Sequence, residues 1–327
     1  MGAAKLHHYV PQFYLRRFVN EEGDFWAWDK INDRLFRTTP KSVAAESDFY
    51  KLYGFAGLEH ALLTMEKQFA DLEGQVSLIT DQWLRWLGEV SRGDRIEIPS
   101  PNREVVSLYV ALQIIRTADA RDIICTIEHL APNGRLSDKD RKLLQAAYLW
   151  GSNLAEPRKK GIGNLTEGGS SMLRLSDREK TRIHTQWLWD LDFIHTVAKR
   201  IEESIWIFGR NLTGCPFFTS DNPVAFKTGD NRKWAKVGVL AEGTYAVFPL
   251  SPQIVMYCHD GHDSVWRKIA KYNDCLSPVD FSIPMVEHEN AGQVFNAWRF
   301  VISPANDFRF ARDFAQTIGT DPHAPQG

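Results

Sequence analysis

Two adjacent imidazoles, His7 and His8, stand close to the start of the chain and directly before an aromatic run over residues 9–18. Imidazole takes up or gives a proton near neutral pH, which suits it to acid–base work. Proline is favoured at the first turn of a helix, so the run predicts about two helical turns over residues 12–18, with Tyr14 and Arg17 near the histidines. We expect His8 to act as a general base, with Tyr14 in the same catalytic set. The structural alternative is that these rings only cap and pack.

A second polar cluster, Ser220-Asp221-Asn222, follows an apolar strand pattern over residues 216–219. Such a strand delivers polar side chains to its carboxyl end, where active-site groups often lie. Ser, Asp and Asn before a proline also form ordinary turns. We expect Ser220 and Asp221 to be catalytic, Asn222 to bind substrate, and Asp221 to orient His8. The side chains of His8 and Asp221 should then lie roughly 3 to 6 Å apart, directly or through one water.

Three further residues are predicted to bind substrate: Arg116, Arg17 and Asp48. A guanidinium group offers a fixed bidentate fork to a phosphate or carboxylate, although a helical arginine is more often solvated or ion-paired. Glu59 and Glu66 are seven residues apart and share a helix face, so they could pair with basic neighbours or bind a cation with the histidines.

The sequence lacks the motifs of several known classes of enzyme. No Walker loop, dinucleotide-binding glycine pattern or H-E-x-x-H is present. Ser220-Asp221-Asn222 and Lys227-Thr228-Gly229 resemble two motifs of β-lactamases, but the Ser-x-x-Lys nucleophile is missing. The spacing of residues 258, 259, 262 and 275, which are cysteines and histidines, fits no zinc motif. No metal ligand is predicted, and the cofactor stays unknown.

The hydrophobic pattern predicts an α+β fold: a central helical bundle flanked by β-rich N- and C-terminal parts that could share one sheet. A hairpin is expected over residues 25–28 and 34–37, and strands over 206–208, 216–219, 245–248 and 254–258. Helices are expected over residues 58–79, 103–130, 138–150, 179–205 and 287–301, with a surface loop over 151–169. We interpret residues 1–327 as one domain, with a hairpin and motif segment (1–57), a helical region (58–205) and a β-rich region (206–327).

Composition narrows the class of partner and the compartment. The 39 basic and 41 acidic residues give no global attraction to nucleic acid, which favours a small or locally held substrate. Four scattered cysteines without a C-x-x-C pair or a secretory signal predict reduced thiols and a cytoplasmic protein. No apolar run approaches the roughly 20 residues that span a bilayer, so no membrane role is expected.

Four segments together resemble the bacterial domain-of-unknown-function 4238 family: residues 8–18 (HYVPQFYLRRF), 48–50 (DFY), 219–224 (TSDNPV) and 248–252 (FPLSP). Asn290 and residues 297–301 (AWRFV) are similar to the family's closing helix. The resemblance carries over the positions His8, Pro11, Tyr14, Leu15, Phe18, Asp48, Arg116, Ser220, Asp221, Asn222 and Asn290, without a role for any of them. It implies no established reaction. Some members occur in bacterial defence loci against phages, where effectors often attack nucleic acids or nucleotides.

These observations give one leading hypothesis and one alternative. The leading hypothesis is a cytoplasmic anti-phage effector, a nuclease or nucleotide hydrolase, with His8 as base, Asp221 as its orienter and Arg116 as an electrostatic clamp. The alternative is a non-enzymatic sensor that binds a phage-derived ligand in the same pocket. An enzyme should show its polar groups converging in an open cleft, whereas a sensor should show them buried and mutually satisfied.

Overall fold

The computed structural model describes residues 6–50, 59–91, 93–129, 142, 145–146, 175–228, 238–241, 243–261, 268, 273 and 275–318. In the first long helix, side chains are described from Lys67 onward. The fold is α+β, as predicted, with a helical middle between strand-rich ends.

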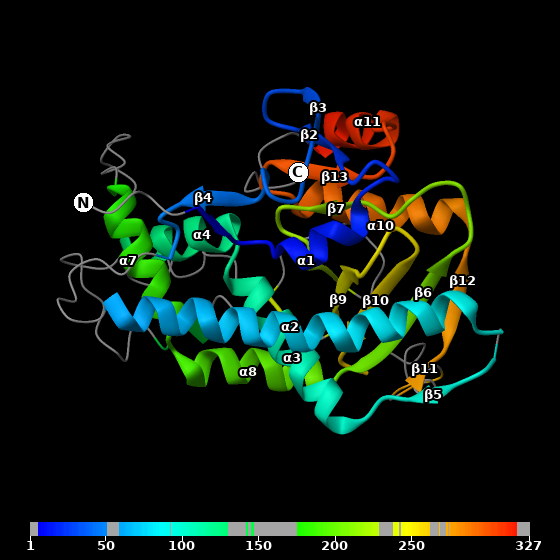
Figure 1. Ribbon diagram of the computed structural model, residues 1–327, viewed down its shortest axis with the longest axis horizontal. Coiled ribbons are helices and arrows are strands. Elements are labelled where there is room, and N and C mark those ends of the chain that lie inside the picture. The colour runs from blue at the N-terminus through cyan, green and yellow to red at the C-terminus, as the bar shows by residue number, and fades with distance from the viewer. Residues whose placement is uncertain are drawn as a thin grey trace.

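The helical region is built around one long helix, which crosses the front of the molecule in Figure 1. Its described helices are α2 (Glu59–Glu89), α3 (Ser100–Ile115), α4 (Ala118–His129), α7 (Asp177–Leu188) and α8 (Leu191–Glu202). Helix α3 packs against both α8 and α2, and α4 packs against α7. This arrangement confirms the predicted central group of helices.

Two of the predicted helices are broken into pairs by side-chain caps. The hydroxyl of Thr117 accepts the amide of Ala120, which starts α4 and ends the predicted helix 103–130 after Ile115. The carboxylate of Asp190 accepts the amide of Phe193, which divides the predicted helix 179–205 into α7 and α8. The helical spacing of apolar residues continues through both breaks. The sequence therefore predicted one uninterrupted helix in each region. The predicted helix 138–150 and loop 151–169 lie largely or wholly outside the described residues.

The apolar stripe of α2 packs on the core in its C-terminal half. Val76 and Leu87 are buried, whereas Phe69 and Leu72 are only partly buried against the core. The apolar stripe over residues 58–79 predicts that Leu62, Met65, Phe69 and Leu72 are largely buried in the core. Phe69 and Leu72 do pack against the core but stay partly exposed, and Leu62 and Met65 lie outside the described side chains.

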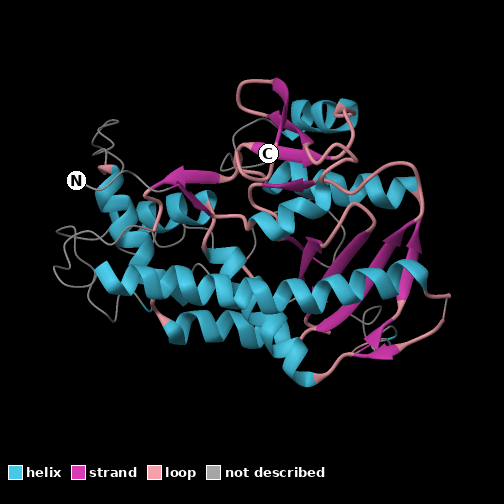
Figure 2. Cartoon of the chain, viewed as in Figure 1, coloured by secondary structure: helices cyan, strands magenta, loops and turns pink. Residues whose placement is uncertain are grey.

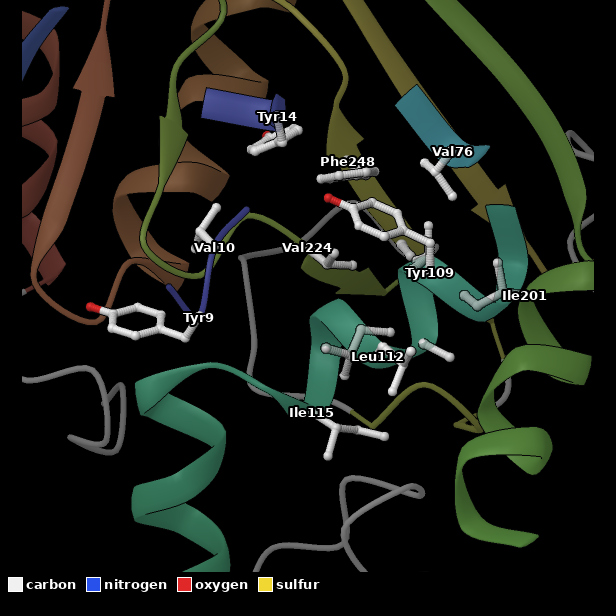
Figure 3. Close-up of a cluster of buried hydrophobic side chains, with 14 of the residues drawn as sticks. Tyr9, Val10, Tyr14, Val76, Tyr109, Leu112, Ile115, Ile201, Val224 and Phe248 are labelled. Carbon is white, nitrogen blue, oxygen red and sulfur yellow. The ribbon is translucent and has the colours of Figure 1, made fainter. Parts of the chain in front are cut away.

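A five-stranded sheet lies beside the helices and is seen on the right of Figure 2. Its order is β12 (Pro278–Phe281), β6 (Ile205–Asn211), β10 (Ile254–His259), β9 (Thr244–Pro249) and β8 (Ala225–Thr228). Only the β12–β6 pair is parallel. One face, with Phe208, Phe248 and Met256, joins the core of the helices and the N-terminal motif, part of which appears in Figure 3. The other face packs against a separate apolar cluster that includes Val286 of α10 (Ile283–Asn296).

The two ends of the chain share a second sheet, which confirms that expectation. The order is β3 (Arg34–Thr38), β2 (Phe25–Asp29), β13 (Phe300–Ser303) and β7 (Thr219–Ser220), so the predicted N-terminal hairpin pairs with a C-terminal strand. The hairpin turn forms because one carboxylate oxygen of Asp29 accepts the amides of Ile31 and Asn32.

The predicted closing helix 287–301 is wrong in its second half. Helix α10 ends at Asn296, Ala297 is extended, and Phe300 begins strand β13. The reason is a buried carboxylate: Asp221 accepts the amides of residues 298–300, which removes those groups from any helical hydrogen bonding. The predicted strand 216–219 is likewise reduced to the two residues of β7.

The remaining described elements are short. They are β1 (Leu6–His8), paired with β4 (Ala45–Ser47); α1 (Gln12–Leu15) and the 3-10 turn Arg16–Phe18; β5 (Ile96–Glu97), paired with β11 (Cys275–Leu276); and α11 (Arg309–Ile318). The four cysteines, all within the described ranges, form no disulfide. None of the helices that the structure describes is long and apolar enough to cross a membrane.

Candidate functional site

The N-terminal motif forms one wall of a groove, and helix α2 forms another. Strand β1 pairs antiparallel with β4, so that His8 lies opposite Ala45. Pro11 then starts α1, because its fixed φ suits a helix N-terminus, and α1 packs against α2. In Figure 1 both β1 and α1 lie above the long helix α2. The end of a strand, a helix start and the side of a long helix thus meet at one place.

This groove encloses about 560 Å³, which is within the usual size range of small-molecule sites. Both polar and aromatic side chains line it. They include His8, Gln12, Phe13, Arg16, Tyr50, Phe69, Glu73 and Arg116.

His8 is half-buried in the groove wall, and both of its ring nitrogens have partners. Nε2 lies 3.1 Å from the carbonyl oxygen of Lys41, so Nε2 carries the proton in the neutral ring. Nδ1 is therefore the lone-pair nitrogen, and it accepts a long contact of 3.4 Å from the Gln12 amide. Burial lowers the pKa of His8 below its usual 6.5, which keeps the imidazole neutral at physiological pH. A neutral, oriented imidazole can accept a proton at Nδ1.

Arg116 is almost completely buried at the α3–α4 break and still lines the groove. Its Nε donates to the carbonyl oxygen of Tyr9 at 3.0 Å, and its Nη2 donates to the carboxylate of Glu73 at 2.9 Å. The guanidinium also lies over the ring of Phe69, with 5.3 Å between its central carbon and the ring centroid. These contacts hold the guanidinium group of Arg116 beside the groove.

Aromatic rings and a second cation complete the groove. Tyr50 is buried, stacks on the ring of His7 and donates its hydroxyl to the carbonyl of Arg116. His7 accepts the backbone amide of Tyr50 at Nδ1, so this imidazole is held in the wall. Arg16 is exposed and donates to the side-chain oxygen of Gln12 at 3.2 Å. The groove therefore combines two guanidinium groups with flat apolar surfaces.

Asp221 does not join His8. The carboxylate of Asp221 is completely buried and accepts the amides of Trp298, Arg299 and Phe300 at 2.9 to 3.0 Å. Burial raises its pKa to about 6. The hydrogen bonds of His8 go elsewhere, so the predicted contact between the two side chains is wrong. The physical reason is that backbone amides satisfy the carboxylate, and a backbone carbonyl orients the imidazole.

Ser220 and Asn222 are also buried in hydrogen bonds between β7 and α10. The Ser220 hydroxyl donates to the side-chain oxygen of Gln293 at 3.1 Å. The Asn222 amide donates to Asp119 at 2.8 Å and to the carbonyl of Asn296 at 3.2 Å. Neither residue lines the groove, so this cluster holds the C-terminal segment in place.

The other three predicted site residues, Tyr14, Arg17 and Asp48, lie outside the groove lining. Tyr14 is completely buried, and its hydroxyl bonds Thr219 at 2.6 Å and the carbonyl of Pro249 at 2.7 Å. Arg17 forms an ion pair of 2.7 Å with Asp81. Asp48 is partly buried in a turn with φ of 58°, a left-handed conformation that aspartate tolerates better than most residues. The structure brings together His8 and Arg116 and places these three outside the groove lining.

Glu73 and Gln12 were missed as site residues. The sequence contained a signal for the first: Glu73 lies seven residues beyond Glu66, which itself lies seven beyond Glu59, so all three share a helix face. The side chains of Glu59 and Glu66 lie outside the described residues. Gln12 had no signal beyond its place one helical turn after His8. Within the described ranges, no group of three His, Cys, Asp or Glu side chains is arranged to hold a metal ion.

Comparison with known proteins gives one match. The family described as "Protein of unknown function (DUF4238)" matches residues 6–307 of the 327, a range that includes every groove residue. No curated protein and no solved structure matches the chain.

Proposed function

Since this chain belongs to the DUF4238 family, whose description names no reaction, we propose from the groove itself that the protein hydrolyses a phosphate ester of a nucleotide or of a nucleic-acid end. The observation that carries the proposal is that a neutral, half-buried His8 and the fixed guanidinium of Arg116 line the same open groove. A base and a fixed positive charge are the two groups that water attack on a phosphate ester needs most.

His8 supplies the base. The Lys41 carbonyl takes the role that a carboxylate has in many catalytic histidines: it fixes the tautomer and leaves Nδ1 unprotonated. The long contact from Gln12 to Nδ1 marks the position that an attacking water would take. In the proposed step Nδ1 takes a proton from this water, whose oxygen forms a bond to phosphorus. The bond between phosphorus and the leaving oxygen breaks, and that oxygen takes the proton that Nδ1 accepted and leaves as an alcohol, which regenerates the neutral imidazole.

The two arginines supply the positive charge. Arg116 cannot move away, since the Tyr9 carbonyl and Glu73 hold it, and a preorganised charge stabilises a transition state without reorganisation. Exposed Arg16 at the groove edge can follow a bound phosphate. The partly exposed ring of Phe13 suits a nucleobase, because bases stack on aromatic rings with little dependence on sequence.

The groove holds a substrate of about one nucleotide. Its volume and the near-neutral charge of the chain support a small ligand or a strand end rather than a long duplex.

One specific observation supports a second candidate, a sensor that binds the same ligand without reaction. Both ring nitrogens of His8 already have partners, so base catalysis requires that Gln12 release Nδ1. A binding protein would have no need of this release.

Purified protein incubated with ribonucleotides, deoxyribonucleotides, and short RNA and DNA, each with and without Mg²⁺, tests both candidates. Products are separated by chromatography, and binding is measured independently by calorimetry. His8→Asn should abolish product and retain binding, whereas the matched control His195→Asn, on the exposed side of α8, should leave both unchanged. Binding without product in the wild type would favour the sensor. Absence of binding to the whole panel would refute the proposal.

We also propose that the cellular role is defence against phages, which rests on the resemblance described above. A phage-susceptible host that carries the wild-type gene should show fewer plaques than one that carries His8→Asn, at equal protein levels. Equal plaque counts would contradict this role while leaving the enzymatic proposal open to the assay above.

A further inference from the structure

A polar row crosses the second face of the five-stranded sheet, far from the N-terminal motif in sequence. Lys227 of β8 is the register partner of Tyr245 of β9, which is in turn the partner of His259 of β10. Register partners point to the same face of a sheet. This face otherwise packs its apolar side chains against α10. A lysine that is 1% exposed at such a place needs an explanation, since lysine is rarely fully buried.

Helix α10 brings a buried carboxyl group to the same place. Glu289 is 7% exposed, and the hydroxyl of Tyr257 bonds its carboxylate. The second oxygen, Oε2, is buried without a hydrogen-bond partner in the part of the chain that the structure describes. Burial raises the pKa of Glu289 to about 7, so this group can both give and take a proton near neutral pH. The oxygen Oε2 is therefore able to form a hydrogen bond with a polar ligand.

The amine of Lys227 lies close to the surface and is covered by the side chain of His288. Its Nζ contacts Nε2 of His288, and His288 is itself exposed. Burial lowers the pKa of Lys227, which favours the neutral, nucleophilic amine. The ring of Tyr245 lies 6.0 Å from Nζ. Desolvation in an apolar site is one way in which imine-forming enzymes activate a lysine amine toward carbonyl compounds.

We propose that Lys227 is a carbonyl-reactive residue that forms an imine with a small aldehyde or ketone, with Glu289 as the proton-transfer group. The Nζ lone pair attacks the carbonyl carbon, the oxygen takes a proton from Glu289, and Glu289 recovers one from the nitrogen. The C–O bond then breaks, the oxygen leaves as water with a second proton from Glu289, and the last nitrogen proton returns to Glu289. Amine and carbonyl compound become imine and water, and Glu289 is regenerated.

The test traps the imine in the wild-type protein. Full-length protein is incubated with acetaldehyde at about pH 7 in the presence of cyanoborohydride, whose hydride reduces an imine to a stable ethyl-lysine. Mass spectrometry of peptides over time gives the ethylation rate of each lysine. Two internal controls are Lys199, whose side chain is 72% exposed, and Lys30, which is buried and donates to the carbonyl of Val294.

Lys227 should be ethylated faster than Lys199, because burial lowers the pKa of its amine and Glu289 can relay the protons that imine formation moves. The preference should vanish in concentrated urea, since it depends on the fold. A rate at Lys227 equal to or below that at Lys199 overturns the proposal. A preference that persists in urea also overturns it, because the reactivity would then belong to the local sequence.

The carboxyl group is tested separately. Glu289→Gln keeps the shape but cannot relay protons, so it should slow ethylation of Lys227 at least about threefold and leave Lys199 unchanged. If this variant does not fold, Tyr257→Phe removes the hydroxyl that holds the carboxylate and should also slow the reaction. An unchanged Lys227 rate in a folded variant refutes the role of Glu289.

Discussion

Acid should weaken the folded state through one completely buried histidine, His184 of α7. Its Nε2 donates to the carbonyl of Ile115 at 2.8 Å, and its ring packs edge-on against Phe49, with 5.4 Å between centroids. Its Nδ1 is buried and has no hydrogen-bond partner among the described residues. Protonation would place a charge on this nitrogen near Arg121. Burial therefore lowers the pKa of His184 to about 3.

The size of the effect follows from this pKa. An unfolded histidine titrates near 6.5, so between about pH 6.5 and 3 the unfolded state binds a proton that the folded state refuses. Stability is then fully present above the unfolded pKa and is lost as the pH falls. The loss from this group is about 2 kcal/mol at pH 5 and approaches about 5 kcal/mol near pH 3. A loss of about 2 kcal/mol is a large fraction of the stability of an ordinary protein.

Urea unfolding of the wild type and of His184→Gln at about pH 7.5 and about pH 5 isolates the contribution, because every other titrating group is common to both proteins. Glutamine can still donate to Ile115 but does not titrate. The stability advantage of the wild type should shrink by about 2 kcal/mol at the lower pH. His195→Gln, at an exposed site on α8, should show no such change. Equal differences between wild type and His184→Gln at both pH values would refute the reasoning.

Three further substitutions test the contacts that position the groove and the sheet. Tyr14→Phe leaves the buried carbonyl of Pro249 without its hydroxyl donor and should cost about 1 to 3 kcal/mol in urea unfolding; a loss below about half a kilocalorie would contradict this. Gly209→Ala would place a methyl group 2.7 Å from the ring of Phe281, so the melting temperature should fall, and an unchanged one would show that the strands can separate. Arg116→Lys removes the planar fork and should weaken nucleotide binding in calorimetry more than it lowers stability, whereas unchanged binding would exclude this cation from the ligand site.

Local sequence patterns predicted those elements whose formation depends mainly on neighbouring residues in the chain. The hairpin followed from aromatic runs around a turn-forming segment, and Asp29 forms the turn as its type suggests. Strands β9 and β10 followed from short apolar runs. Their pairing with β6 and β8, and the parallel β12–β6 contact, join residues distant in the chain, for which residue types provide no signal.

The failures arose where one side chain overrides a periodic pattern. Thr117 and Asp190 each cap a new helix inside a stretch whose apolar spacing continues without interruption. Asp221, about eighty positions away in the chain, binds the amides of residues 298–300, so the helix ends before them and Phe300 begins strand β13. Cap-forming types at the two breaks could have been recognised as helix starts. The effect of Asp221 on residues 298–300 could not have been recognised from the sequence, because it depends on a tertiary contact.

The same reasoning explains why the sequence indicated His8 as a member of the candidate site but indicated the wrong partner for it. A carboxylate can be recognised in a sequence from its residue type. The imidazole of His8 needs a hydrogen-bond acceptor that orients it, and for this reason the sequence analysis assigned Asp221 to that role. Every residue also carries a carbonyl, and the one that orients His8 belongs to Lys41, a residue whose side chain suggests no such role. The carboxylate that does reach the groove, Glu73, is engaged with Arg116 and fixes the cation instead of the base. The fold therefore determines how the two groups are held. The backbone carbonyls of Lys41 and Tyr9 bind His8 and Arg116, and the side chains of both residues line the groove.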